Sequence, residues 1–251
     1  KLTSLTLAGN YISGNIPQGI GNLVNLHFLS LFEMMLTGSI PDSIGKLSKL
    51  QRVLLHTNNI SGIIPSSIRN ITQLGILDLA DNNLEGGIPV SLGDCENLQG
   101  LNLSNNQLSG AIPRQLVDLF SLLFLYLDYN HLTGPLPLQV GNLKNIEVLS
   151  ISGNKLSGEI PSTLGDCLVL EFLYMDANLF QGTIPSSFTQ LKGIQVLSLS
   201  HNNLSGHIPR FLGKFPFIQN LNLSYNMFED EVPNEGVFLN VSAFSIVGNN
   251  K

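Results

Sequence analysis

The sequence contains no tryptophan, only two cysteines and few charged residues. Charged side chains make up 12% of the 251 residues and the formal net charge is −6, so the chain lacks the basic surface that nucleic-acid binding requires. No apolar run approaches the roughly 20 residues that cross a bilayer. These absences argue against a nucleic-acid-binding protein and against a membrane-spanning segment within this stretch of sequence.

Proline, in contrast, recurs with a fixed period. Ten of the twelve prolines follow one another at steps of 24 residues, from Pro17 to Pro233, and most are preceded by a glycine at three residues and an asparagine at seven. A period of about 20 to 29 residues with Leu-x-x-Leu-x-Leu-x-x-Asn-x-Leu is typical of leucine-rich repeats. We therefore divide residues 1–241 into ten 24-residue repeats and interpret residues 242–251 as the start of a C-terminal cap.

Each repeat is expected to form one short strand and a turn or two of helix. In the fifth repeat, Leu101 and Leu103 alternate with polar residues, as in a strand with one buried face. Asn106 follows where the chain leaves the strand, and its amide can both donate to and accept from the backbone, which predicts a hydrogen-bonded ladder. Stacked copies predict an α/β repeat solenoid, a superhelix with a parallel β-sheet on its concave face.

The cysteines and the last repeat give two further expectations. Cys95 and Cys167 occupy the same position three repeats apart, so a strand spacing of ~4.8 Å separates them by about 14 Å, twice the reach of a disulfide. They are predicted to be free, buried thiols. In the last repeat Asp230 replaces the glycine, and Asn250 falls 24 residues after Asn226.

The repeat resembles the plant-specific leucine-rich repeat along the whole chain. The variant Leu-x-Leu-x-x-Asn-x-Leu-Ser-Gly-x-Ile-Pro is seen in residues 149–161 and 197–209. Residues 232–251 resemble the end of the ectodomain in plant receptor kinases of the group that includes the flagellin and elongation-factor receptors and the rice bacterial-blight resistance receptor. The resemblance implies an intact protein with a signal peptide, more N-terminal repeats, a transmembrane helix and a cytoplasmic Ser/Thr kinase. It also implies that this segment lies on the extracellular side of the plasma membrane.

An extracellular location fits the N-x-S/T sequons of the chain, most of which we expect to carry glycan. The sequons are at Asn59, Asn70, Asn102, Asn203, Asn222 and Asn240.

No nucleophile–base arrangement and no metal-ligand spacing stands out from the repeat. The five histidines are scattered, and a lone histidine on a surface is far more often inert than catalytic. We expect no enzymatic activity, metal or cofactor in this segment, which leaves binding as its function.

The repeat also fixes which side chains face outward from the sheet. Solvent accepts Ser or Asn at such positions, so the large and charged residues there require another explanation. Tyrosines supply contact area at little entropic cost and are favoured at interface hot spots. We predict a ligand-binding surface for an extended peptide, with cations against the acids and apolar side chains against the aromatics; the alternative is an ordinary polar sheet with scattered aromatics. The predicted residues are Phe32, Leu54, His56, Asp78, Asp81, Tyr126, Asp128, Tyr129, Glu171, Tyr174 and Asp176.

Three functions are open at this point. The resemblance implies a pattern-recognition-type receptor that senses a peptide or protein and pairs with a leucine-rich-repeat co-receptor kinase near its C-terminal repeats. The alternative is a secreted inhibitor of a microbial cell-wall-degrading enzyme, similar to the polygalacturonase-inhibiting proteins, whose paired-cysteine caps are missing here. A third is a structural role such as ice binding, against which the irregular outward aromatics argue.

Overall fold

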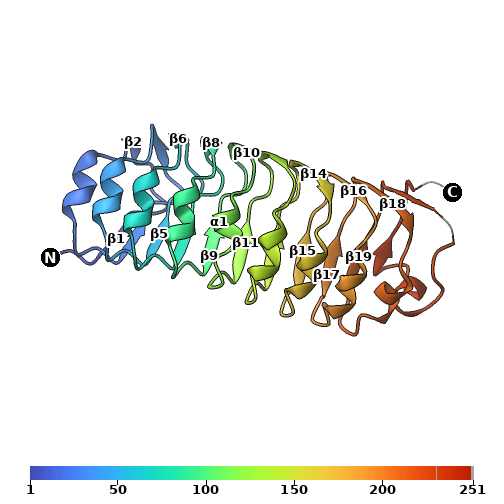
Figure 1. The fold of residues 1–251 in the computed structure, drawn as a ribbon. Coiled ribbons are helices and arrows are strands. Elements are labelled where there is room, and N and C mark those ends of the chain that lie inside the picture. The colour runs from blue at the N-terminus through green and yellow to red at the C-terminus, as the bar shows by residue number, and fades with distance from the viewer. Residues whose placement is uncertain (230, 250–251) are drawn as a thin grey trace.

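The computed structural model describes residues 1–229 and 231–249 (Figure 1). The chain forms an elongated stack of repeats, with the two ends of the chain at opposite ends of the stack. Two residues named above, Asp230 and Asn250, lie outside the described part.

An eleven-stranded parallel sheet runs the length of the stack. Neighbouring strands pair at a step of 24 residues, as Leu77 does with Leu101, up to the last pair, where Leu221 meets Phe244 at a step of 23. The predicted parallel-sheet solenoid is therefore confirmed. The strands are β1 (Ser4–Thr6), β3 (Phe28–Ser30), β5 (Arg52–Leu54), β7 (Ile76–Asp78), β9 (Gly100–Asn102), β11 (Phe124–Tyr126), β13 (Val148–Ser150), β15 (Phe172–Tyr174), β17 (Val196–Ser198), β19 (Asn220–Asn222) and β21 (Phe244–Ser245).

The middle residue of each strand supplies the core, because side chains alternate between the two faces of a strand. Leu77, Leu101 and Leu125 are each 1% exposed and belong to a hydrophobic cluster that continues through the stack. The first and third strand residues point to the opposite, open side of the sheet. This alternation decides which residues a ligand can reach.

A second set of strands forms where the chain leaves the main sheet. Glycines with positive φ, such as Gly110 (φ 79°) and Gly134 (φ 77°), form the turns there, because a side chain disfavours this conformation. Eight of these strands form one parallel sheet and two form another. They are β6 (Ser61–Gly62), β8 (Asn83–Gly87), β10 (Gln107–Gly110), β12 (His131–Gly134), β14 (Lys155–Glu159), β16 (Leu179–Gly182), β18 (Asn203–His207) and β20 (Met227–Glu229), with β2 (Ser13–Asn15) pairing β4 (Met35–Thr37).

Short helices cover the back of the stack (Figure 1). Most begin directly after the periodic proline, whose fixed φ suits a helix start. The 3-10 helices are η1 (Gln18–Asn22), η2 (Asp42–Lys46), η3 (Ser66–Asn70), η4 (Val90–Asp94), η5 (Leu138–Asn142), η6 (Ser162–Asp166), η7 (Ser186–Gln190), η8 (Arg210–Lys214) and η9 (Gly236–Leu239), and α1 (Arg114–Val117) is α-helical.

Glycines bring these helical segments close together. A Cβ atom added at Gly45 would lie 2.5 Å from the carbonyl oxygen of Ser67, and one at Gly141 would lie 2.5 Å from that of Thr163. Both distances are shorter than a van der Waals contact. Neighbouring helical segments therefore touch backbone to backbone at these repeats.

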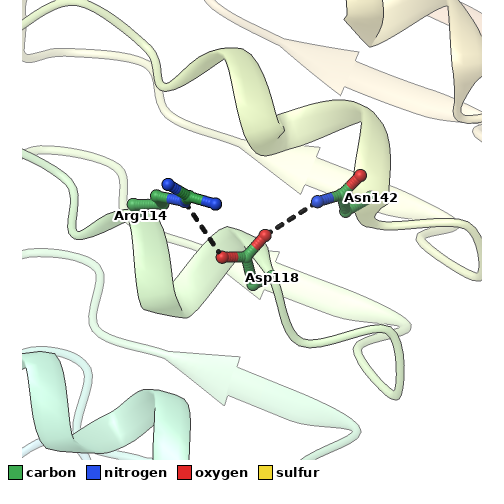
Figure 2. A network of polar contacts seen from close by, with 3 residues as sticks. All are labelled: Arg114, Asp118 and Asn142. Carbon is green, nitrogen blue, oxygen red and sulfur yellow. Dashed lines mark hydrogen bonds and ion pairs between the residues drawn. The ribbon is translucent and has the colours of Figure 1, made fainter.

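A polar contact links α1 to η5 on the same layer (Figure 2). The guanidinium of Arg114 lies 3.3 Å from Oδ2 of Asp118. Oδ1 of Asp118 accepts a 2.7 Å hydrogen bond from the side-chain amide of Asn142. Both charged side chains are exposed, so the pair contributes at most about 1 kcal/mol.

The predicted asparagine ladder is present. Asn106 Nδ2 donates to the carbonyls of Leu79, Leu103 and Ser104 at 3.0 to 3.1 Å, and its Oδ1 accepts from the Leu84 N–H at 2.9 Å. Each asparagine thus satisfies backbone groups in its own repeat and in the repeat before it. Met34 interrupts the series in the second repeat, since a thioether cannot donate.

The ladder ends one residue earlier than a strict period of 24 would place it. Asn249 Oδ1 accepts from the Phe228 N–H at 3.2 Å, and its Nδ2 donates to Leu223 and Ile246 at 3.0 and 2.7 Å. Asn249 therefore follows Asn226 in the ladder. The single-residue shortening agrees with the 23-residue step of the last strand pair.

Both cysteines are free and buried, as predicted. Their Sγ atoms lie against backbone carbonyls, Cys95 at 3.7 Å from Ile68 and Cys167 at 3.3 Å from Val140. Burial raises the pKa of Cys95 to about 11 and that of Cys167 to about 12. Both groups are therefore neutral thiols at physiological pH.

Candidate ligand-binding face

We call the outward side of the eleven-stranded sheet, together with the second and third residues after each strand, the open face. Five predicted residues gather on it over repeats 2 to 4. The rings of Phe32 and His56 stack at 4.4 Å between centroids, and Leu54 pairs in register with Asp78. Asp81 is exposed in the loop that follows β7. This group combines a half-buried apolar surface with two carboxylates.

Asp78 is held in place by its neighbours. Its carboxylate accepts from the Ala80 N–H at 3.1 Å, and the side chain of Asn102 lies nearby. Desolvation by burial raises the pKa of Asp78 above its ordinary value, although this hydrogen bond and nearby His56 oppose the increase. A cation bound beside Asp78 would stabilise the charged form of this carboxyl, which burial disfavours.

Four more predicted residues gather over repeats 6 to 8. Tyr126 and Tyr174 occupy the same column of the sheet on either side of Ser150. The pKa of Tyr126 is raised by desolvation, and next by the Asp128 carboxylate and by Tyr174, which places these three groups near one another. Asp176 completes the group in the neighbouring column.

Serines connect the two aspartates of this second group. Asp128 accepts hydrogen bonds from the Ser150 hydroxyl and, at 3.2 Å, from the Ser152 N–H. The Ser152 hydroxyl donates to Asp176 at 2.9 Å. Burial raises the pKa of Asp128, with the Asp176 charge adding to the increase.

The remaining two predicted residues lie apart. Tyr129 is 61% exposed and has a positive φ of 50°, and its ring covers Gly153 of the next repeat, where an added Cβ would lie 2.6 Å from the ring. Glu171 lies at the other end of its strand and accepts from Gln195 Nε2 at 2.8 Å. The carboxylate of Glu171 therefore does not belong to the same group of side chains as that of Asp176.

One apolar column of the open face was not among the residues predicted from the sequence. The first residue of each main strand points outward, and most of these are half-buried hydrophobic residues. The alternation of a strand predicts this, because a residue two positions before an outward residue also faces outward. The column contains Phe28, Ile76, Phe124, Val148, Phe172 and Val196, and we call it the apolar stripe.

The sequons divide into two classes by exposure. Four are exposed, at Asn59, Asn70, Asn203 and Asn240. Asn102 and Asn222 are half-buried on the open face, where each Oδ1 accepts at 3.2 Å from a serine N–H two residues on. The amide of Asn222 also donates to Ser200 at 3.3 Å.

The described part of the chain holds neither a cluster of metal-ligating side chains nor a membrane-spanning helix. Residues 1–229 and 231–249 contain no group of three or more His, Cys, Asp or Glu side chains that could hold a metal ion. Over the same residues, no helix has the length and apolar character needed to cross a membrane.

The repeats match known leucine-rich-repeat sequences over much of the chain. Two family models described as leucine rich repeat match residues 72–132 and 170–228, and residues 1–23, 49–71 and 145–167. No curated protein sequence matches the chain.

Solved structures include plant receptors with a similar fold. The plant peptide hormone receptor RGFR1 in complex with RGF2 is 32% identical, with a TM-score of 0.89, over 99% of this chain and 44% of that one. The Arabidopsis receptor kinase HAESA in complex with the peptide hormone IDA and the co-receptor SERK1 is 31% identical, with a TM-score of 0.76, over 98% of this chain and 49% of that one. The chain spans less than half the length of both receptor chains.

A plant ice-binding protein shares the fold as well. It is 29% identical, with a TM-score of 0.86, over 98% of this chain and 79% of that one. The fold alone therefore does not decide among functions. From its repeats and its strand register, the chain belongs to the leucine-rich-repeat proteins and is similar to the ectodomains of plant receptor kinases that bind peptides.

Proposed function

We propose that the chain is the extracellular ligand-binding segment of a plant pattern-recognition-type receptor kinase. It senses a peptide or protein ligand on the open face and pairs with a co-receptor kinase, while a cytoplasmic Ser/Thr kinase elsewhere in the intact protein carries the signal. This segment itself performs no catalysis.

One observation carries the proposal. The apolar stripe is flanked on the open face by two groups that each combine aromatic or aliphatic side chains with carboxylates, one around Asp78 and one around Asp128. Apolar contact area beside unneutralised carboxylates suits an extended peptide that carries basic residues. The similar receptor structures were solved with peptide hormones bound, which favours a peptide receptor over the inhibitor alternative.

An ice-binding function has less support from the outward residues. A surface that matches ice requires the same side chain at each repeat, whereas the central column here changes from Leu54 to Asp78, Asn102 and Tyr126 in successive repeats. Irregular columns of this kind suit a ligand of irregular sequence.

The proposed co-receptor contact lies near the C-terminal repeats. Large apolar side chains are exposed there, with Phe217 at 62%, Leu239 at 71% and Val241 at 87%. We infer that these side chains contribute to the co-receptor contact, because exposed apolar patches mark interaction surfaces. The HAESA structure contains the co-receptor SERK1, which supports an equivalent partner for this chain.

The test is co-elution of the purified protein with a co-receptor ectodomain, with and without a fractionated microbial peptide extract. Co-elution that depends on the extract is the expected result, and the double variant Tyr126→Ala with Tyr174→Ala should weaken ligand binding by about 2 kcal/mol or more. Tyr11→Ala is the matched control, because Tyr11 is 94% exposed and lies in the first repeat, five repeats before Tyr126. Unchanged affinity of the double variant would exclude the second group as the anchor.

A further inference from the structure

A hollow interrupts the apolar stripe at Gly100. Glycine replaces the large residue that the stripe has in the neighbouring strands, Ile76 on one side and Phe124 on the other. The hollow has a volume of about 270 Å³ and is also lined by Leu101, Asp78 and other residues of the three strands. It opens onto the open face between the two groups of predicted ligand-binding residues.

The backbone does not require glycine at this position. Gly100 lies in the regular strand β9, lacks the positive φ of the turn glycines, and its N–H donates to the Gly75 carbonyl at 3.0 Å. An added Cβ would meet only the Cδ1 atom of Ile76, at 2.9 Å, and that atom is the mobile end of its side chain. Glycine inside a strand weakens the strand and often marks a place where a ligand approaches closely.

The size and lining of the hollow define what it can hold. Sites that enclose a whole small molecule have volumes of about 300 to 1,000 Å³, so this hollow suits one large side chain of a ligand that otherwise lies outside it. Ile76 and Phe124 make its interior apolar, whereas Asp78, Asn102 and Tyr126 bring polar atoms to it. An aliphatic or aromatic side chain fits the interior, and a neighbouring cation fits the carboxylate.

The ligand must reach the hollow through its side chains. Strands β7, β9 and β11 each pair with a neighbour on both sides, so no strand edge is free there to bind a peptide backbone. The nearby carboxylates of Asp78 and Asp128 disfavour an anionic ligand and attract a basic one.

We propose that the hollow at Gly100 is a specificity subsite that takes one large apolar side chain of a peptide ligand, with a basic residue of the same peptide against Asp78. The subsite rests on the proposed peptide-receptor function and adds the chemistry of the residue that is recognised. The sequon at Asn102 borders the hollow, so the subsite requires that Asn102 remain without a glycan.

The probe for this proposal is a phage-displayed library of random 12-residue peptides selected on the wild-type protein. Enriched peptides should share a large apolar residue next to Lys or Arg, and changing that apolar residue to Ala should weaken binding about 10- to 100-fold, as expected for burial of one such side chain. Gly100→Val should fill the hollow and weaken the binding of the selected, unsubstituted peptide (the parent peptide) by a similar factor. On that variant the parent and Ala peptides should bind equally.

Two further variants complete the design. Asn220→Val adds the same side chain at the same strand position in the tenth repeat and should leave peptide binding unchanged. Gly100→Ala fills the hollow only in part and should give an intermediate loss, which keeps the test valid if Gly100→Val unfolds.

The outcomes separate the subsite from the proposed function. Peptides that depend on Tyr126 and Tyr174 but bind wild type and Gly100→Val equally would overturn the subsite and leave the peptide receptor standing. Failure of the library to yield any peptide that binds the wild-type protein would overturn the subsite, whereas failure of the co-elution test would overturn the receptor function. A glycan found on Asn102 by mass spectrometry of protein from plant cells would also overturn the subsite.

Discussion

Replacing Asn106 by Leu tests the physical basis of the stack. The two side chains are similar in size, so the substitution removes the hydrogen bonds of the ladder without leaving a large cavity. Asn106 is 7% exposed and lies in the fifth repeat, where loss of contact with the neighbouring repeats cannot be relieved by fraying from an end.

The expected loss follows from the groups that Asn106 satisfies. The Leu84 N–H loses the Oδ1 acceptor, and a buried donor without a partner costs about 1 to 3 kcal/mol. The three carbonyls each keep another donor, Asn82 for Leu79, Asn130 for Leu103 and the Asp81 N–H for Ser104. With about 0.5 kcal/mol for each of these lost bonds, the total is about 3 kcal/mol.

Urea unfolding followed by circular dichroism measures this loss. The matched control is Asn97→Leu, because Asn97 is exposed and makes a single 2.8 Å bond to the Thr72 carbonyl; its loss should stay below about 1 kcal/mol. Hydrogen exchange of the Leu84 amide should accelerate in the Asn106 variant. If both variants lose the same small free energy, the ladder does not hold the repeats together.

Three other predictions concern charge, thiols and glycans. Asp128→Asn should raise the free energy of unfolding at pH 7 and weaken the binding of basic peptides. Burial raises the pKa of this carboxyl above 3.8, so the charge of the wild-type side chain opposes folding at neutral pH. The gain in stability should therefore vanish when urea titrations are made at low pH. Cys95 and Cys167 should resist a thiol reagent at pH 8 and react fully in denaturant, because their raised pKa values and burial keep them as neutral, inaccessible thiols; fast reaction of the native protein would contradict this burial. Glycopeptide mass spectrometry should find glycan at the four exposed sequons and none at Asn102 or Asn222, and a glycan at either strand position would show that the open face is obstructed.

The repeat made most of the fold predictable from the sequence. A strict step of 24 residues predicted the strands, the ladder and the free, buried state of Cys95 and Cys167, because each repeat can bury its leucines only against its neighbours. The step failed where the chain stops repeating, and Asn249 took the ladder position one residue early. A single irregular repeat carries no periodic signal of its own.

The candidate site was predictable only in part. The strand alternation indicated outward residues such as Tyr126 and Asp128, but the serine bridges to Asp176 depend on side-chain conformations that spacing does not determine. Glu171 was grouped with these acids, although it lies at the opposite end of its strand. Nothing in the sequence pattern marked Gly100 as part of a site. A glycine creates a hollow only if the side chains of the neighbouring strands leave the space above it empty, and this is known only from the structure.

The contacts at Gly45 and Gly141 determine how sharply the molecule bends. A solenoid curves when its repeats are spaced further apart in one layer than in the other. Bulky residues between the helices would increase the spacing of the helical layer relative to that of the main sheet. Glycine lets these helical backbones approach closely, which limits how far the helical layer can spread along the stack. The stack in Figure 1 bends only slightly, so a ligand can follow the open face across many repeats without a sharp bend.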